Sequence, residues 1–253
     1  MIETEVRDGV AVLRMKHGKA NALDAEFCLA LMQELGRLEA APVSSVVLTG
    51  QGRIFCAGVD LIRLAEEGPS YIRQFLEEFH GFCQSIFAFP KPVVAAINGH
   101  ALAGGYILAC MADRRLMARD GGRVGLPELL VGLPFPPGAM EILRFALPRR
   151  HFARMIYGGA TFEPVPALDR GLIEEVLDPD ELLPAAVAAA VTLAEVGHDT
   201  FRLTKRQIRQ PALDRMRARH REVGAEVERI WTAPETKARV RRYVEQTLRG
   251  RGR

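Results

Sequence analysis

Two glycine-centred segments carry the residue pattern that most directly suggests chemistry. One runs from Phe55 to Leu61, and the other from Asn98 to Gly105. Each follows a short apolar run, Ser45–Thr49 or Val93–Ile97, and each precedes a stretch that is compatible with a helix. A strand that breaks at glycine into a helix start leaves backbone N–H groups unpaired and open to close approach. Two such turns can direct two N–H donors at one oxygen, which predicts an oxyanion hole.

The surrounding sequence predicts strands that alternate with helices. Alternating residues on both sides of Asp8-Gly9 indicate a β-hairpin near the N-terminus. Asp24 is a plausible N-cap for a helix with apolar residues at helical spacing, and Tyr71 to Phe87 shows the same spacing. A short helix is expected from Gly104, followed by a strand over Arg115 to Met117. Repeated strand pairs with intervening helices predict an α/β fold.

Beyond Pro179 the pattern is helical throughout. The expected helices cover Glu181 to Val196, Ala212 to Ile230 and Thr236 to Leu248. The turn at Gly197 divides the chain into an α/β core over residues 1–196 and a helical region over residues 197–253. Apolar positions in this second region need a partner surface to bury them.

Composition is that of a soluble globular protein. The chain has 253 residues, of which 48% are hydrophobic and 26% are charged. Its four cysteines show no metal-ligand spacing, so we expect reduced thiols and no metal site. The N-terminal residues lack the basic and apolar regions of a signal peptide. We therefore expect a cytoplasmic location.

Two stretches raise the question of a membrane or a nucleic acid as a partner. Residues 92–112 carry no charge, but glycines and Asn98 fall at the centre, which favours a buried strand, turn and helix over a membrane span. From Arg202 to Arg253 there are 16 Lys and Arg against 6 Asp and Glu. Such a segment suits a phosphate-rich ligand, nucleic acid or simply a solvated helical face. Without aromatic interleaving or metal-finger spacing, nucleic acid is the weakest of the three, and a solvated face is the commonest explanation.

The two glycine segments and their partners resemble the crotonase (enoyl-CoA hydratase/isomerase) superfamily. The resemblance is carried by Asn21–Leu23, Phe55–Leu61, Lys91–Gly105, Gly125–Gly132 and Gly171–Ile173. It implies a crotonase-like spiral of repeated ββα units, followed by a C-terminal helical oligomerisation region. The substrate would be an acyl-CoA thioester, with no separate cofactor. The resemblance also implies a homotrimer or a dimer of trimers, with Trp231 sheltered from solvent.

Matching the family's motifs assigns roles to individual residues. The oxyanion donors would be the backbone N–H groups of Val59 and Gly104. Backbone groups around Lys19-Ala20 and Cys56-Ala57 would hold CoA, and Lys205 or the arginines of the tail could meet its 3′-phosphate. The expected site is completed by Gly58, Asp60, Leu61, Ala103 and Ile107.

The matching also reveals a departure from the hydratases of this family. They carry two catalytic glutamates, and Ile107 stands where the first is expected, whereas Glu128 matches the second. A single carboxylate is a poor clamp for water, but it can move a proton between two carbons of one acyl group. This arrangement resembles the Δ3-Δ2-enoyl-CoA isomerase branch. Glu128 would be the proton shuttle, with a pKa raised by burial.

Other assignments remain open at the level of sequence. The alternatives are an enoyl-CoA hydratase that acts with Glu128 alone and an acyl-CoA-binding homologue that has lost turnover. Pro136 occupies the position where dienoyl-CoA isomerases place an aspartate, which argues against that activity. We expect Asp60 to shape its turn, His100 to be a satisfied turn histidine, and Glu141 to lie on the solvated face of its helix.

Overall fold

A mixed six-stranded sheet forms the base of the molecule. The computed structural model describes residues 1–249. The sheet order is β1-β2-β3-β5-β7-β10. Its strands are β1 (Ile2–Arg7), β2 (Val10–Met15), β3 (Ser45–Thr49), β5 (Val93–Ile97), β7 (Arg114–Ala118) and β10 (Glu175–Leu177). The predicted hairpin is confirmed, because β1 and β2 pair antiparallel around Asp8 and Gly9, both at positive φ. The remaining strand pairs are parallel.

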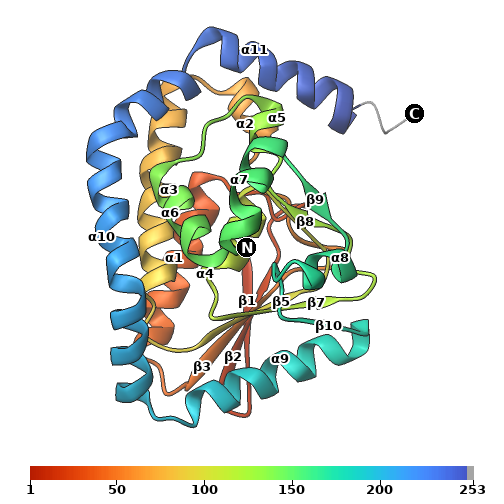
Figure 1. Ribbon diagram of the computed structural model, residues 1–253, viewed down its shortest axis with the longest axis vertical. Helices are drawn as coiled ribbons and strands as arrows, with labels where there is room; N and C mark the ends of the chain where they lie inside the picture. Colours follow the sequence, from red (N-terminus) through yellow and green to blue (C-terminus); the bar gives the residue numbers. More distant parts are fainter. Residues whose placement is uncertain (250–253) are drawn as a thin grey trace.

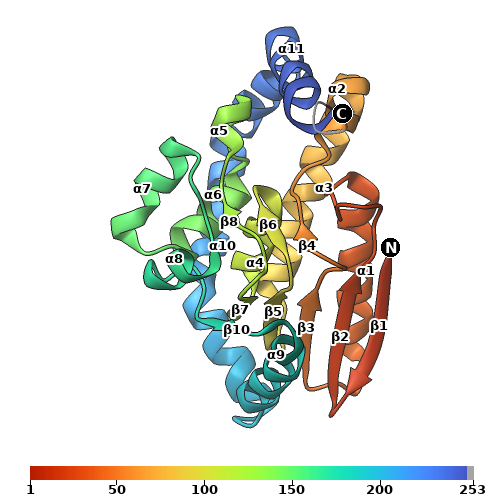
Figure 2. The same ribbon diagram turned by 90° about the vertical axis from the view of Figure 1, so that its right-hand side faces the viewer.

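A second, smaller sheet has four short strands. Its order is β4-β6-β8-β9, with β4 (Ile54–Cys56), β6 (His100–Leu102), β8 (Val124–Gly125) and β9 (Thr161–Phe162). In three successive units a strand of the large sheet (β3, β5 or β7) is followed by one of the small sheet (β4, β6 or β8) and then by a helix, so these units stack as a spiral (Figure 2). This arrangement confirms the expected fold of repeated ββα units.

Helices cover both faces of the large sheet (Figure 1). Helix α9 packs on one face, against strand residues that include Val12, Val47 and Val94, and the main core lies on the other. With both faces covered, β3 and β5 read as unbroken apolar runs. The first nine helices are α1 (Ala25–Ala40), α2 (Leu61–Glu66), α3 (Pro69–Ala88), α4 (Gly104–Met111), α5 (Glu128–Val131), α6 (Pro137–Ala146), α7 (Arg149–Gly158), α8 (Pro164–Asp169) and α9 (Pro179–Ala194).

The C-terminal region differs in detail from the sequence expectation. Helix α10 (His198–Trp231) runs for 34 residues and starts well before Ala212, with Pro211 inside it. It is followed by α11 (Pro234–Tyr243) and a π-helical turn, Val244–Arg249. Residues 250–253 of the expected helical region lie outside the described residues. The first half of α10 was missed because it is buried through charged side chains, which apolar periodicity does not detect.

Those charged side chains form a buried ionic cluster around Asp113. Its carboxylate accepts hydrogen bonds from Lys205 Nζ and Arg209 Nη2, each at 2.7 Å, and from the backbone N–H of Val93 at 2.8 Å. Burial lowers the pKa of Lys205 to about 8, against the opposing attraction of Asp113. Arg209 also donates to the carbonyl of Phe87. The cluster therefore attaches α10 to the ends of α3 and β5.

The tail also buries apolar side chains against its own chain. Trp231 is 4% exposed, stacks on Phe75, and donates from Nε1 to the carbonyl of Pro134 at 2.9 Å. The shelter expected for Trp231 thus exists within one chain. The expectation for Glu141 was wrong: it is 4% exposed and pairs with Arg215 of α10 at 2.7 Å, because α10 covers that face of α6.

None of the described helices is by itself long and apolar enough to cross a membrane, although α9 and α10, bent by 95°, satisfy length and composition criteria as a pair. The uncharged stretch over residues 92–112 contains β5, β6 and α4, as the sequence predicted.

Removing the Asp113 carboxylate tests the role of the ionic cluster. We expect Asp113→Asn to lower the free energy of unfolding by about 3–5 kcal/mol, because it leaves two buried cations without their counter-charge. Urea unfolding followed by circular dichroism measures the change. Asp214→Asn is the matched control. Asp214 lies on α10, the helix that carries Lys205 and Arg209, and pairs with Arg217 on the exposed face of that helix. The control should cost less than about 0.5 kcal/mol, and equal losses in the two variants would contradict the assignment.

Candidate active site

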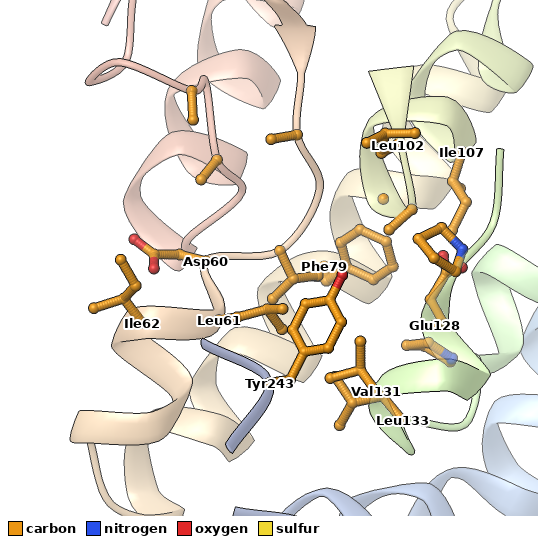
Figure 3. A pocket seen from close by; sticks show the side chains of 18 of the residues that line it. Asp60, Leu61, Ile62, Phe79, Leu102, Ile107, Glu128, Val131, Leu133 and Tyr243 are labelled. Carbon is orange, nitrogen blue, oxygen red and sulfur yellow. The ribbon is translucent and has the colours of Figure 1, made fainter. Parts of the chain in front are cut away.

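One pocket brings together most of the residues that the sequence singled out. Its volume is about 380 Å³, and its wall combines the loop after β2, both glycine segments, α3, α5 and the C-terminal helices. The side chains that line it are predominantly apolar, and Glu128 lies among them close to Ile107 (Figure 3). The spiral therefore gathers parts of the chain that are far apart in sequence around one apolar chamber.

The two glycine segments pack backbone against backbone. Gly58 has φ +91°, and a Cβ there would lie 2.7 Å from the carbonyl oxygen of Leu102 and 3.1 Å from the nitrogen of Gly104. A Cβ at Gly105 would lie 1.9 Å from the carbonyl oxygen of Cys56. A side chain at either position would force the segments apart. Glycine is required here because the contact leaves no space for a Cβ atom.

Neighbouring hydrogen bonds hold Val59 in place but leave its N–H free of backbone acceptors. The N–H of Leu23 donates to Gly58 O at 2.8 Å, and the N–H of Asp60 donates to Leu23 O at 3.0 Å. These two bonds flank Val59 on either side. Among the described residues, no backbone carbonyl accepts from Val59. Its N–H is therefore available to a ligand.

Gly104 offers a second amide of the same kind. Ala103, at φ +50°, donates to Gly125 O at 2.8 Å and accepts from the N–H groups of Tyr106 and Ile107. Helix α4 begins immediately afterwards, so the N–H of Gly104 lies in its first turn, without a backbone acceptor in residues 1–249. The helix dipole adds partial positive charge at this end. The short approach between Gly58 and Gly104 brings both donors to one part of the pocket.

Glu128 is the buried carboxylate of the site. It begins α5, and neither Oε1 nor Oε2 has a hydrogen-bond partner among the described residues. Burial raises its pKa from 4.5 to about 8, opposed only by its own backbone amide. Such a group is ready to hold or release a proton near neutral pH. The burial and the raised pKa agree with the sequence expectation for Glu128, whereas its missing partners were not predicted.

The structure also places an apolar residue, Ile107, at the position where hydratases of the family were expected to carry a first glutamate. Ile107 is 2% exposed and lines the same chamber as Glu128. Asp60 is the only other carboxylate in the described lining, and its side chain caps α2 by accepting from the N–H of Arg63 at 2.9 Å. The expected structural role for Asp60 is therefore met. A second carboxylate for holding a water opposite Glu128 is not found among the lining residues.

Ten of the expected site residues line the pocket. These are Lys19, Ala20, Ala57, Val59, Asp60, Leu61, Ala103, Gly104, Ile107 and Glu128. Cys56 and Gly58 do not; they shape the site by packing against the second segment. The Cys56 thiol is fully buried, and burial raises its pKa to about 12.

The expected ligand role of Lys205 is not supported, because its ammonium group is buried against Asp113 and it does not line this pocket. His100 also lies outside the lining, and its Nδ1 accepts from the N–H of Arg123. It is hydrogen-bonded, as the sequence predicted, but it begins strand β6 rather than lying in a turn. No cluster of three or more potential metal-ligating side chains occurs in the part of the chain that the structure describes.

Several lining residues were not predicted as part of the site. Trp231 and Tyr243 come from the C-terminal helices, and Phe79, Leu133 and Phe135 complete the apolar wall. Sequence patterns identify these residues only as apolar helix or loop positions. Their arrangement around the pocket depends on the tertiary packing of α10 and α11.

The chain is similar in sequence to enoyl-CoA hydratases and enoyl-CoA isomerases. The family model for enoyl-CoA hydratase/isomerase matches residues 5–248. A putative enoyl-CoA hydratase of Thermus thermophilus is 32% identical over 213 residues, covering 81% of this chain and 82% of the relative. The mitochondrial enoyl-CoA delta isomerase 1 of Mus musculus is 27% identical over 219 residues, covering 85% of this chain and 76% of the relative.

Solved structures of an enoyl-CoA isomerase and an enoyl-CoA hydratase have the same fold as this chain. The human mitochondrial delta3-delta2-enoyl-CoA isomerase shares the fold with a TM-score of 0.94, at 23% identity and with 99% of each chain covered. A probable enoyl-CoA hydratase of Mycobacterium tuberculosis gives a TM-score of 0.83 at 30% identity, covering 89% of this chain and 95% of the other. With its two glycine segments in contact and Glu128 in the chamber beside them, the chain belongs to the enoyl-CoA hydratase/isomerase family.

Proposed function

We propose that this protein is an enoyl-CoA isomerase that converts a 3-enoyl-CoA into a 2-enoyl-CoA. The observation that carries the proposal is the single buried carboxylate. Glu128 has no hydrogen-bond partner within residues 1–249, burial raises its pKa to about 8, and Ile107 rather than an acid lies in the wall beside it. Relatives with isomerase and with hydratase names are both similar to the chain, so the chemistry of the pocket is what favours isomerisation.

The proposed reaction begins with the thioester oxygen between the N–H groups of Val59 and Gly104. The Glu128 carboxylate takes a proton from C2, and the electron pair of that C–H bond moves into the π-system. This gives a dienolate whose oxygen carries the negative charge, stabilised by both amides and the start of α4. Glu128 then returns the proton to C4. A double bond forms between C2 and C3, and the one between C3 and C4 is lost.

Hydration would need more than this arrangement supplies. Adding water to a 2-enoyl-CoA requires a water molecule held for attack at C3, and Ile107 offers no hydrogen bond to it. An apolar wall also disfavours the presence of an ordered water. A protein that only binds acyl-CoA would gain nothing from burying Glu128, since an unpaired buried carboxyl group is costly.

The proposal extends to partners and assembly. CoA would enter past Lys19 and Ala20, since Gly18 and Lys19 are exposed residues of the pocket lining. The reaction needs no cofactor because electrons are only redistributed within the acyl group. We also propose that copies assemble as trimers or pairs of trimers. Exposed apolar residues support an interface, notably Leu130 at 62% and Tyr157 at 78% exposure.

The balance between the two reactions tests the proposed function directly. We expect isomerisation of a 3-enoyl-CoA to be at least about tenfold faster than hydration of the matching 2-enoyl-CoA, since one water-holding acid is missing. Spectrophotometric assays of the two substrates side by side measure the ratio. Ile107→Glu, which adds a second carboxylate, should shift the ratio toward hydration. Equal turnover of both substrates by the natural chain would contradict the proposal.

Replacing the proposed proton shuttle should remove turnover but not binding. We expect Glu128→Gln to lower kcat by about 10²–10⁴-fold, because the amide keeps the side-chain volume but cannot accept the C2 proton. The affinity for a saturated acyl-CoA, measured by calorimetry, should stay within a few-fold. Activity retained above about a tenth of the natural level would show that another group is the base.

The raised pKa of Glu128 predicts a specific pH dependence. Only the carboxylate form can accept the proton, so we expect kcat/KM for isomerisation to rise through pH 8 and then level off. Stability should change in the opposite sense. The folded state binds more protons than the unfolded state between pH 4.5 and about 8, so stability falls as pH rises through that window.

Thermal unfolding of the natural chain and of Glu128→Gln across pH checks the second part of this prediction. The variant should gain stability relative to the natural chain as pH rises from 5 to 9, because it has no buried charge to form. A constant difference over this range would mean that Glu128 titrates at its ordinary pKa.

A further inference from the structure

Helix α11 lies at the end of the molecule away from the large sheet, beside α2 and α5 (Figure 1), and it contacts both of these helices, which contribute to the pocket wall. On the α2 side, Lys237 Nζ donates to Glu67 O at 2.6 Å, and Arg241 Nε donates to Ala65 O at 3.1 Å. On the α5 side, Arg239 lies over Gly132, where a Cβ would be 2.4 Å from its Cδ atom. The helix therefore bridges the two walls rather than hanging from one of them.

Tyr243 is the last residue of this helix, and its side chain enters the pocket. Figure 3 shows its ring between Leu61 on one wall and Val131 and Leu133 on the other. Val240 and Val244 flank it and are 2% and 3% exposed, so the last turn of α11 is fixed by packing. The ring fills space in the chamber without being part of the buried core.

The positions of the oxyanion donors and of Glu128 indicate which part of a ligand would lie near Tyr243. The amides of Val59 and Gly104, together with Glu128, would hold the thioester and carbons C2 to C4. Acyl carbons beyond C4 then have to occupy the apolar remainder of the pocket, lined by Phe79, Leu133, Phe135, Trp231 and Tyr243.

Most of the side chains that line this part of the pocket are fixed by packing and hydrogen bonds. Phe75 stacks on both Phe79 and Trp231, at ring-centroid distances of 5.6 and 6.0 Å, and the Trp231 indole is hydrogen-bonded to Pro134 O. Shortening one of these rings would open the core. Tyr243 is different because its ring extends into the pocket from α11, between Leu61, Val131 and Leu133, so the size of its side chain affects how far the chamber reaches there.

We infer that Tyr243 determines specificity by closing the acyl end of the pocket and limiting the length of the acyl chain. This inference rests on the proposed function for the identity of the ligand, but not on whether the reaction is isomerisation or hydration. The ring supplies the barrier, whereas the hydroxyl group is not required for it.

Affinity for saturated acyl-CoA thioesters, from butyryl-CoA to palmitoyl-CoA, tests the inference without any turnover. The natural chain should show affinity that rises with chain length and then falls at a limit. Tyr243→Ala should move this limit to longer chains, with a gain of about fourfold for each further methylene that becomes buried. Isothermal titration calorimetry of each variant against the same series gives the profile.

Two further variants act as controls. Tyr243→Phe keeps the ring and should keep the natural limit, and Arg242→Ala changes an exposed neighbour on the same helix and should do the same. Tyr243→Leu should give an intermediate limit, and it also covers the case in which the alanine variant does not fold.

The outcomes separate this inference from the proposed function. An unchanged length profile in both Tyr243→Ala and Tyr243→Leu would overturn the role of Tyr243 while leaving the acyl-CoA site intact. A shift of the limit in Tyr243→Phe as large as that in Tyr243→Ala would overturn the steric explanation. Failure of the natural chain to bind any acyl-CoA in the series would overturn the proposed site itself, and the inference with it.

Discussion

The contact between the two glycine segments is the constraint on which the rest of the site depends. Gly58 and Gly105 allow main chain to meet main chain where any side chain would collide, and this contact sets the distance between the amides of Val59 and Gly104. The large and small sheets hold each segment at the end of a strand, so the spacing is determined by the whole spiral. A donor pair placed in advance needs no rearrangement when charge develops on a bound oxygen.

The desolvated carboxylate makes sense only together with those donors. Glu128 is costly to ionise in an apolar chamber, which is why its pKa rises to about 8. When it accepts a proton in the proposed reaction, its charge disappears as charge appears on the thioester oxygen. Negative charge thus moves from a place that destabilises it to one lined by amides and a helix N-terminus. The apolar wall at Ile107 and the oxyanion donors are two parts of one electrostatic arrangement.

Local signals were sufficient to predict the N-terminal hairpin, several of the main strands and helices and the two glycine turns, whereas the roles of Glu128, Val59 and Gly104 came from the resemblance to a known family. The Asp8-Gly9 turn, the Asp24 cap and the glycine segments act over a few residues, so they can be recognised from sequence. Three features could not be predicted because they depend on partners that are distant in sequence: the early start of α10, the burial of Glu141 and the entry of Tyr243 into the pocket. Charged residues are expected at the surface, and Lys205, Arg209 and Glu141 are buried only because opposite charges meet them.

The short helix α5 connects the chemistry of the pocket with the outer surface of the molecule. Glu128 at its first position faces the chamber, whereas Leu129 and Leu130, the next two residues, are 38% and 62% exposed. Leu130 also covers Gly159 at the end of α7, where a Cβ would be 2.6 Å from its Cγ atom. A second copy that covered these leucines would restrain the helix that positions the base. The proposed assembly would therefore act on the orientation of Glu128, while α11 of the same chain contacts α5 and contributes Tyr243 to the pocket lining.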